Sequence, residues 1–187
     1  MRLIITADGV LARFSNQLGA LGKKAPLAMQ RALARTGDGA RKQVVRALAQ
    51  QTGLPQKRVI HRAVRIKRPH FGDLSYTMTT RGGDIRLKYF RARETRKGVA
   101  ASPWGERKVF AGTFMRAGWI WKNRIIKSNW NGQVFRRTGA GEFEVVRSGV
   151  IIPAEMVKGA TVQAWHAAVD RNLEQRLRHE IGRLLPG

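Results

Sequence analysis

Clustered lysines and arginines are the residues whose type and spacing point most clearly to a chemistry. One cluster places six basic residues within twelve positions: Lys57, Arg58, Arg62, Arg65, Lys67 and Arg68. A second lies in the segment 91–108 and comprises Arg91, Arg93, Arg96, Lys97, Arg107 and Lys108. Such clusters bind phosphates by Coulomb attraction and counterion release, without reading base sequence. In an ordinary protein they would simply be solvated surface.

The overall charge favours a polyanionic partner for at least one of these clusters. Lys and Arg total 36 against 12 Asp and Glu, giving a formal net charge of +24 in 187 residues. So large a surplus repels itself and needs a polyanion or acidic neighbours nearby. Nucleic acid is the commonest such partner of a basic domain, and a membrane surface is the rival.

Large aromatic residues follow the second cluster in the sequence. They are capable of stacking on bases, yet no pattern of aromatics on adjacent strands is legible. We therefore interpret them as core or subunit-interface residues, because large aromatics dominate such contacts. The interface candidates are Phe110, Phe114, Trp119, Trp121 and Trp130. Trp165 instead belongs to the apolar stripe of a helix and is expected in the core.

Catalytic chemistry has little support. The four histidines have no metal-ligand spacing, and the chain has no cysteine for a disulfide or thiolate site. Glu142 and Glu144 can face one side of a strand, but acids two positions apart are common by chance. The short glycine turn 139–141 is no phosphate cradle. We expect no enzyme activity, no metal and no cofactor.

Helical periodicity dominates the first third of the chain. Asp8 can cap a helix with Phe14 and Leu18 on its apolar face, and a longer amphipathic helix is predicted over 26–51. Gly37 lies on the stripe of that helix, where it either permits a close approach or breaks the helix. A short helix is predicted from Pro55 to about Arg62.

The pattern then changes to strands. Residues 74–80 and 85–91 are predicted as a hairpin turning at 82–84, followed by a polar loop over 92–106. Further strands are predicted at about 108–116, 119–127, 133–138 and 142–147. The chain ends in an amphipathic helix that Thr161 can cap. No window is apolar enough to span a bilayer, and no signal segment is evident, so cytoplasmic synthesis is expected.

This order of elements predicts an α+β fold with N-terminal helices, a central, mostly antiparallel β-sheet and a long C-terminal amphipathic helix. We expect one domain spanning 1–187. Its parts are a helical region 1–62, a β-rich region 63–157 containing the basic loop 91–108, and a C-terminal helix 158–187.

The layout resembles the minor tail protein Z family of long-tailed bacteriophages. The resemblance is carried by segments that follow one another in the family's order. These are the Ala- and Arg-rich helix 26–51, the basic run 57–68, the strand 84–88, the Arg- and Lys-dense loop 91–97, the stretch 108–114 and the hairpin 131–137. The segment 150–157 and the helix after it match the family best.

The resemblance implies a virion protein of the tail or neck, synthesised in the host cytoplasm. It implies tail completion by a homo-oligomeric ring, a hexamer, at the head-proximal end of the tail tube. There the ring would assist head–tail joining, contact tail terminator, tube and neck proteins, and hold the genome end. The family supplies no catalytic residues, and no membrane partner is expected.

Under this interpretation, we expect the whole second cluster, Arg107 and Lys108 included, to contact double-stranded DNA without sequence preference. Arg91, Arg93, Arg96 and Lys97 are expected to face the DNA path, because the stretch after them has little demand for burial. The basic run 57–68 is the alternative DNA face. The alternative function is a free DNA- or RNA-binding accessory protein, and a nuclease or toxin is less favoured. A tail terminator or tape-measure gene beside this one would favour the tail protein.

Overall fold

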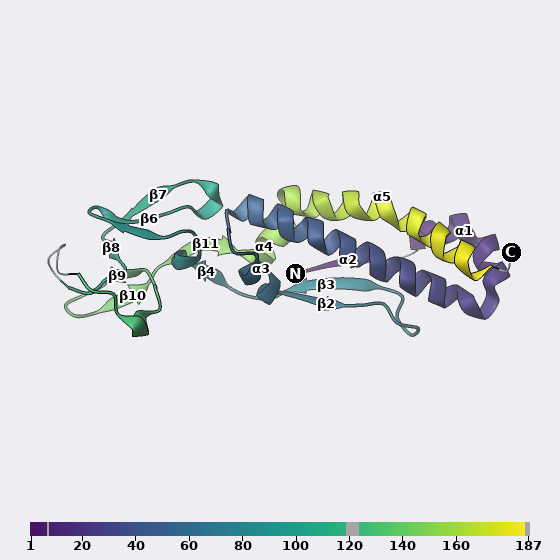
Figure 1. Ribbon diagram of the computed structural model, residues 1–187, viewed down its shortest axis with the longest axis horizontal. Helices are drawn as coiled ribbons and strands as arrows, with labels where there is room; N and C mark the ends of the chain where they lie inside the picture. The colour runs from purple at the N-terminus through teal and green to yellow at the C-terminus, as the bar shows by residue number, and fades with distance from the viewer. Residues whose placement is uncertain (7, 119–123, 186–187) are drawn as a thin grey trace.

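A computed structural model describes residues 1–6, 8–118 and 124–185 of the chain. The molecule is elongated, with long helices and a small sheet along one half and several short strands gathered at the other end (Figure 1). Helices and antiparallel strands are both prominent, so the predicted α+β class is confirmed.

Five α-helices lie within the described residues. They are α1 (Asp8–Leu21), α2 (Ala25–Thr52), α3 (Lys57–Ala63), α4 (Ile152–Met156) and α5 (Gly159–Leu184). The three longest agree with the periodicity of the sequence. Pro26 occupies the first turn of α2, where its missing N–H costs nothing, and Gly53 ends that helix with a left-handed φ of 72°.

The strands form four small antiparallel sheets rather than one central sheet. In the order in which the strands pair, β1 (Arg2–Ile5), β3 (Tyr76–Thr80) and β2 (Val64–Lys67) form the first, and β11 (Arg147–Ile151) and β4 (Asp84–Arg86) form the second. The third contains β5 (Arg93–Thr95), β6 (Gly98–Ala101) and β7 (Lys108–Ala111). The fourth contains β10 (Phe143–Val145), β9 (Phe135–Arg137) and β8 (Thr113–Phe114).

Helix α2 runs unbroken through Gly37, and the close approach at that residue is to a strand. A Cβ atom on Gly37 would lie 2.3 Å from ring atoms of Tyr76, which is fully buried in β3. The Tyr76 hydroxyl donates a hydrogen bond of 3.0 Å to Asp38, the next residue of α2. Burial, together with this hydrogen bond, raises the pKa of Tyr76. The first sheet therefore packs directly on the α2 backbone.

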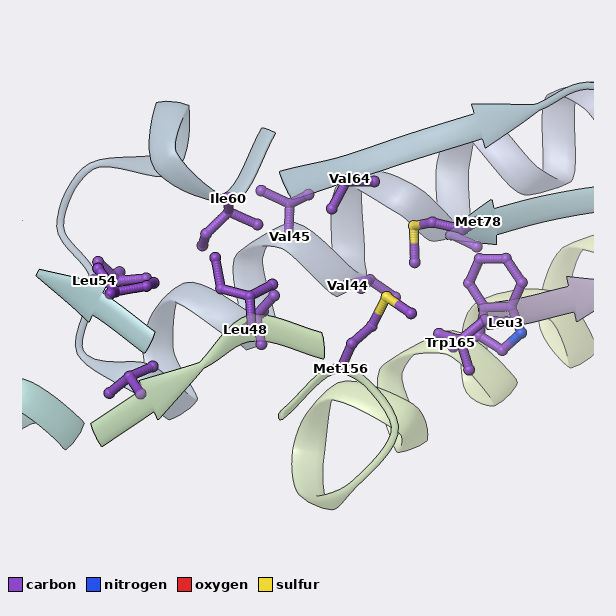
Figure 2. Packing of buried hydrophobic residues seen from close by; sticks show 14 of the residues in the cluster. Leu3, Val44, Val45, Leu48, Leu54, Ile60, Val64, Met78, Met156 and Trp165 are labelled. Atoms are coloured by element: carbon purple, nitrogen blue, oxygen red, sulfur yellow. The ribbon is translucent and has the colours of Figure 1, made fainter. Parts of the chain in front are cut away.

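Helix α5 lies antiparallel beside α2 and completes the helical layer (Figure 1). Its Trp165 is buried, and the ring lies 6.4 Å from that of Tyr76. Figure 2 shows Trp165 close to Leu3 and Met78 of the sheet, with the side chains of α2 and α3 continuing the same apolar cluster. The expected core position of Trp165 is confirmed.

A polar joint fixes the start of α5 against the end of α2. The Gln51 side chain donates 2.8 Å and 3.2 Å hydrogen bonds to the Glu155 carboxylate and carbonyl, and its oxygen accepts from the N–H and hydroxyl of Thr161. Thr161 is buried inside the first turn of α5, and the N-cap position belongs to Lys158. The expectation that Thr161 caps this helix is therefore wrong.

Other strand predictions also need correction. The strands β3 and β4 do not form a hairpin, because β3 pairs with β1 and β2 whereas β4 pairs with β11. The expected loop 92–106 instead contains the β5–β6 hairpin, and β6 is buried throughout. Residues 124–127 form no strand, while the short strands β1 and β11 were not predicted.

The contact at Gly37 generates a stability prediction with a matched control on the same helix. We expect Gly37→Ala to lower the free energy of unfolding by roughly 1–3 kcal/mol, because the added methyl overpacks the Tyr76 ring. Gly39 has nothing within 4 Å of its Cβ position. Gly39→Ala should therefore raise the free energy of unfolding by about 0.5–1 kcal/mol. Urea denaturation of both variants measures the difference, and equal stabilisation would contradict the close contact.

Candidate nucleic-acid interface

The first basic surface is the β5–β6 hairpin, where arginines are held on a rigid framework instead of a loop. Arg91, Arg93, Arg96 and Lys97 are exposed, and no carboxylate within the described part of the chain forms an ion pair with them. Gly98, the first residue of β6, permits β7 to approach closely, since a Cβ atom there would lie 2.1 Å from the Phe110 carbonyl oxygen.

The hairpin does not bring the whole second sequence cluster together. Arg96 and Lys97 form the turn next to Gly98, which pairs with Ala111, whereas Lys108 pairs with Ala101 at the other end of β6. Three residues of strand separate the two ends by about 10 Å. Lys108 also forms a 2.8 Å ion pair with Glu106. Arg107 and Lys108 are thus a separate group from the turn.

The second basic surface begins on α3 and continues on β2. Lys57, Arg58 and Arg62 are exposed on α3, while Ile60 of the same helix is buried in the core. Two members of the cluster are engaged with acids, because Lys67 lies 2.7 Å from Asp73 and Arg68 lies 2.9 Å from Asp38. Their neighbours Lys57, Arg58, Arg62 and Arg65 form no ion pair among the described residues.

Register extends this second surface onto the neighbouring strands. Thr79 lies opposite both Arg2 and Arg65, so these three residues form a row across the outer face of the first sheet. Leu3, Met78 and Val64 point to the other face and are buried. Spacing along the chain does not suggest Arg2 as a member of this surface, because β1 lies far from β2 in the sequence.

A third basic surface, missed by the sequence analysis, follows the outer face of α2. We call it the α2 ridge, and it consists of Lys24, which is the N-cap residue of α2, and of Arg31, Arg35, Lys42 and Arg46 within the helix. All five are exposed and are spaced 7, 4, 7 and 4 residues apart. Successive residues turn by about 100°, so the five fall within an arc of about 60°. Plotting the basic residues by their angle around the predicted helix would have revealed the ridge. Their number per stretch of sequence does not reveal it, because they are four to seven positions apart.

The aromatic candidates gather at the β-rich end. Phe114 and Trp130 pack with Phe135 and Phe143, at ring-centroid distances from 4.9 Å for Trp130–Phe135 to 6.0 Å for Phe114–Phe143. Phe110 is half-buried against the main core. Trp119 and Trp121 lie outside the described residues.

Apolar side chains are also exposed at the β-rich end of the molecule. The exposed fraction is 46% for Phe143, 52% for Val109, 59% for Ile125 and 75% for Ile126. We call these four residues the apolar tip. They were not singled out in the sequence, where Phe143 and Val109 resemble ordinary strand residues.

A buried ion pair between Glu94 and Arg124 connects the β5–β6 hairpin to the segment that precedes Ile125 and Ile126 of the apolar tip. The Arg124 guanidinium lies 2.5 Å from a Glu94 carboxylate oxygen, and Glu94 is only 4% exposed at its side chain. The other Glu94 oxygen accepts a hydrogen bond from the Met115 N–H. Glu94 thereby ties β5 to the segment after β8.

The acids considered for catalysis are spread over the surface. Glu142 and Glu144 are exposed, and Glu144 pairs with Arg136 in the β9–β10 ladder. Among the described residues, no three His, Cys, Asp or Glu side chains gather as a metal site would require. In the same part of the chain, no helix has the length and apolar character needed to cross a membrane.

Comparison with known proteins agrees with the layout seen in the sequence. The family model described as prophage minor tail protein Z (GPZ) matches residues 13–186. No curated protein and no solved structure matches the chain. The family match includes both long helices and all the strands after β1, and it confirms the resemblance. Because it extends over nearly the whole sequence, the chain belongs to the prophage minor tail protein Z family.

Proposed function

We propose that this phage minor tail protein is a tail completion protein. In this proposal it forms a ring at the head-proximal end of the tail tube, assists head–tail joining, and holds the genome end through contacts that ignore sequence. Family membership supports a structural role in the virion tail. The proposed contact with the genome end rests on one observation: many exposed cations lie on an elongated molecule that has few acids to neutralise them.

The charge distribution supports DNA as a partner. The hairpin cations and those of α3 and β2 project from regular elements into solvent, and most have no carboxylate partner in the described residues. Exposed cations of this kind bind phosphate oxygens through long-range attraction and counterion release. Such contacts position a protein on a duplex and carry no base information.

The apolar tip supports assembly with other proteins. A highly charged protein gains little from exposing Val109, Ile125, Ile126 and Phe143 unless a partner covers them. A subunit interface with an apolar centre is the arrangement that such side chains suit. The proposed partners are further copies of this chain in a ring, which the family resemblance suggests is hexameric, and the neighbouring terminator, tube and neck proteins.

The ring can be tested in intact particles. We expect a density map to contain a closed symmetric ring of this protein at the head-proximal end of the tail. The double variant Val109→Ser, Ile126→Ser should reduce its incorporation, because the apolar centre of the interface is removed. Phe71→Ser serves as the control, since Phe71 is 66% exposed but lies in the turn between β2 and β3. A single asymmetric copy in the particle would overturn the proposed ring.

The hairpin and the α3–β2 surface can be separated by the salt dependence of duplex binding. Removing one phosphate contact reduces the slope of log affinity against log salt by about 0.9. Changing Arg91, Arg93, Arg96 and Lys97 to Gln should reduce the slope by roughly 2–4 if most of them touch phosphates. The matched variant changes Lys57, Arg58, Arg62 and Arg65 to Gln.

Comparison of these two variants identifies which surface contacts DNA. A normal slope in the hairpin variant together with a reduced slope in the α3–β2 variant would move the proposed DNA contact to α3 and β2. Strong DNA or RNA binding by a protein that never enters the particle would instead favour the free nucleic-acid-binding alternative.

We also infer that the protein is not an enzyme. Incubation of purified protein with plasmid DNA or RNA and Mg²⁺ or Mn²⁺ should leave both substrates intact, because Glu142 and Glu144 are exposed to solvent and Glu144 lies opposite Arg136. Cleavage that disappears in Glu142→Gln or Glu144→Gln would contradict this inference.

A further inference from the structure

We propose that the α2 ridge is a binding surface for the phosphate backbone of duplex DNA, separate from the hairpin and from the α3–β2 surface. This inference rests on the DNA contact of the proposed function and assigns to it a surface formed by a single helix. The ridge residues are Lys24, Arg31, Arg35, Lys42 and Arg46, as defined above.

The ridge has the dimensions of a phosphate-tracking surface. From Arg31 to Arg46 it rises by about 22 Å along the helix axis. One turn of duplex DNA is about 34 Å long, so a straight ridge of this length spans about two-thirds of a turn and meets the few phosphates that face it. Long, flexible lysine and arginine side chains in a narrow arc are able to reach several of these phosphates at once.

One buried acid of α5 engages two of the five ridge cations, and the other three have no acidic partner among the described residues. The Glu180 carboxylate on α5 lies 2.7 Å from Arg35 and 3.9 Å from Arg31. No ion pair to Lys24, Lys42 or Arg46 occurs among the residues that the structure describes. Asp38, the acid of α2, is engaged by Arg68 and by the Tyr76 hydroxyl on the side of the sheet. Lys24, Lys42 and Arg46 therefore give the outward face uncompensated positive charge, whereas Glu180 partly offsets the charge of Arg31 and Arg35.

The surroundings of the ridge fit a nucleic acid better than a protein. Stable protein interfaces have a desolvated apolar centre. The exposed large apolar residues of the described chain all lie outside α2, and four of the nine form the apolar tip. Between the ridge cations the helix exposes Gly39 and Gln43. A surface of cations and small polar groups without an apolar anchor suits a hydrated, highly charged partner such as DNA.

The backbone that carries the ridge is held in place by its neighbours. The other sides of α2 are packed against α5 and against the first sheet, so the backbone that carries the ridge is fixed before any partner binds (Figure 1). Pre-organised charges lose less conformational entropy on binding than charges on a mobile segment. The exposed face of α5 differs in charge, because Asp170 and Glu174 lie among its arginines. It therefore offers a control surface on the neighbouring helix.

The test uses the full-length protein and measures the salt dependence of its binding to random-sequence duplex DNA. The ridge variant is Lys24→Gln, Lys42→Gln, Arg46→Gln. Arg31 and Arg35 stay unchanged, because their removal would leave buried Glu180 without its α2 partners and destabilise the fold. The control variant, Arg171→Gln, Arg176→Gln, Arg178→Gln, removes the same charge from the exposed face of α5.

We expect the slope of log affinity against log salt to fall by about 2–3 in the ridge variant and by less than about 1 in the control. Both variants should unfold at the temperature of the parent. Equal reductions in the two variants would attribute the effect to net charge and overturn the proposal. An unchanged slope in a ridge variant that fails to join tails to heads would identify the ridge as a protein contact and also overturn it.

The parent protein separates failure of this inference from failure of the proposed function. If the parent has no salt-dependent affinity for duplex DNA, the proposed DNA contact itself is wrong. If the parent binds and the ridge variant keeps the full slope, only the assignment to α2 is wrong, and the hairpin and the α3–β2 surface are left as the contacts.

Discussion

The contact between the Tyr76 ring and the backbone of α2 at Gly37 is the constraint on which the helical half depends. Any side chain at position 37 would hold the first sheet away from the helix, because the Cβ position is 2.3 Å from the ring. The same ring meets Trp165 of α5, and its hydroxyl reaches Asp38. One aromatic residue thus fixes the sheet, α2 and α5 relative to one another, and leaves a single face of α2 in solvent.

The scarce acids of this basic protein hold elements together. Glu155 and Gln51 join the ends of α4 and α2, Glu180 faces Arg35 across the α2–α5 contact, and Glu94 accepts from the segment after β8 and binds Arg124. Carboxylates buried at such joints are strongly coupled to their cations, because water screens them little. They engage only a few of the 36 Lys and Arg residues, so most of the surplus of arginine and lysine remains on the surface without an acid beside it.

The two ends of the molecule therefore differ in surface chemistry. The helical half presents cations on α2, α3 and β2, whereas the β-rich end combines the hairpin arginines with an exposed apolar tip. A component of a phage tail that joins other proteins around a DNA path would use both kinds of surface. Apolar side chains give specific protein contacts, and solvated cations give DNA contacts that tolerate any sequence.

The sequence by itself determined the long helices, the α+β class and the family. Apolar residues repeating every three or four positions report one buried face, and that signal is local and strong in α2 and α5. Gly37 left two alternatives open in the sequence, a close approach of another helix or a break in α2, and the structure shows a strand residue packed against it. The short strands escaped this kind of reasoning, because strands of two to five residues carry little periodicity and pair with segments far away in the chain. Only the tertiary structure decided that β1 completes the first sheet, that the supposed basic loop is a hairpin with a buried second strand, and that Arg2 and Arg65 share a row. It also determined which face of α2 remains uncovered, since that depends on where α5 and the sheet pack, and this exposure turns five scattered basic residues into one continuous ridge.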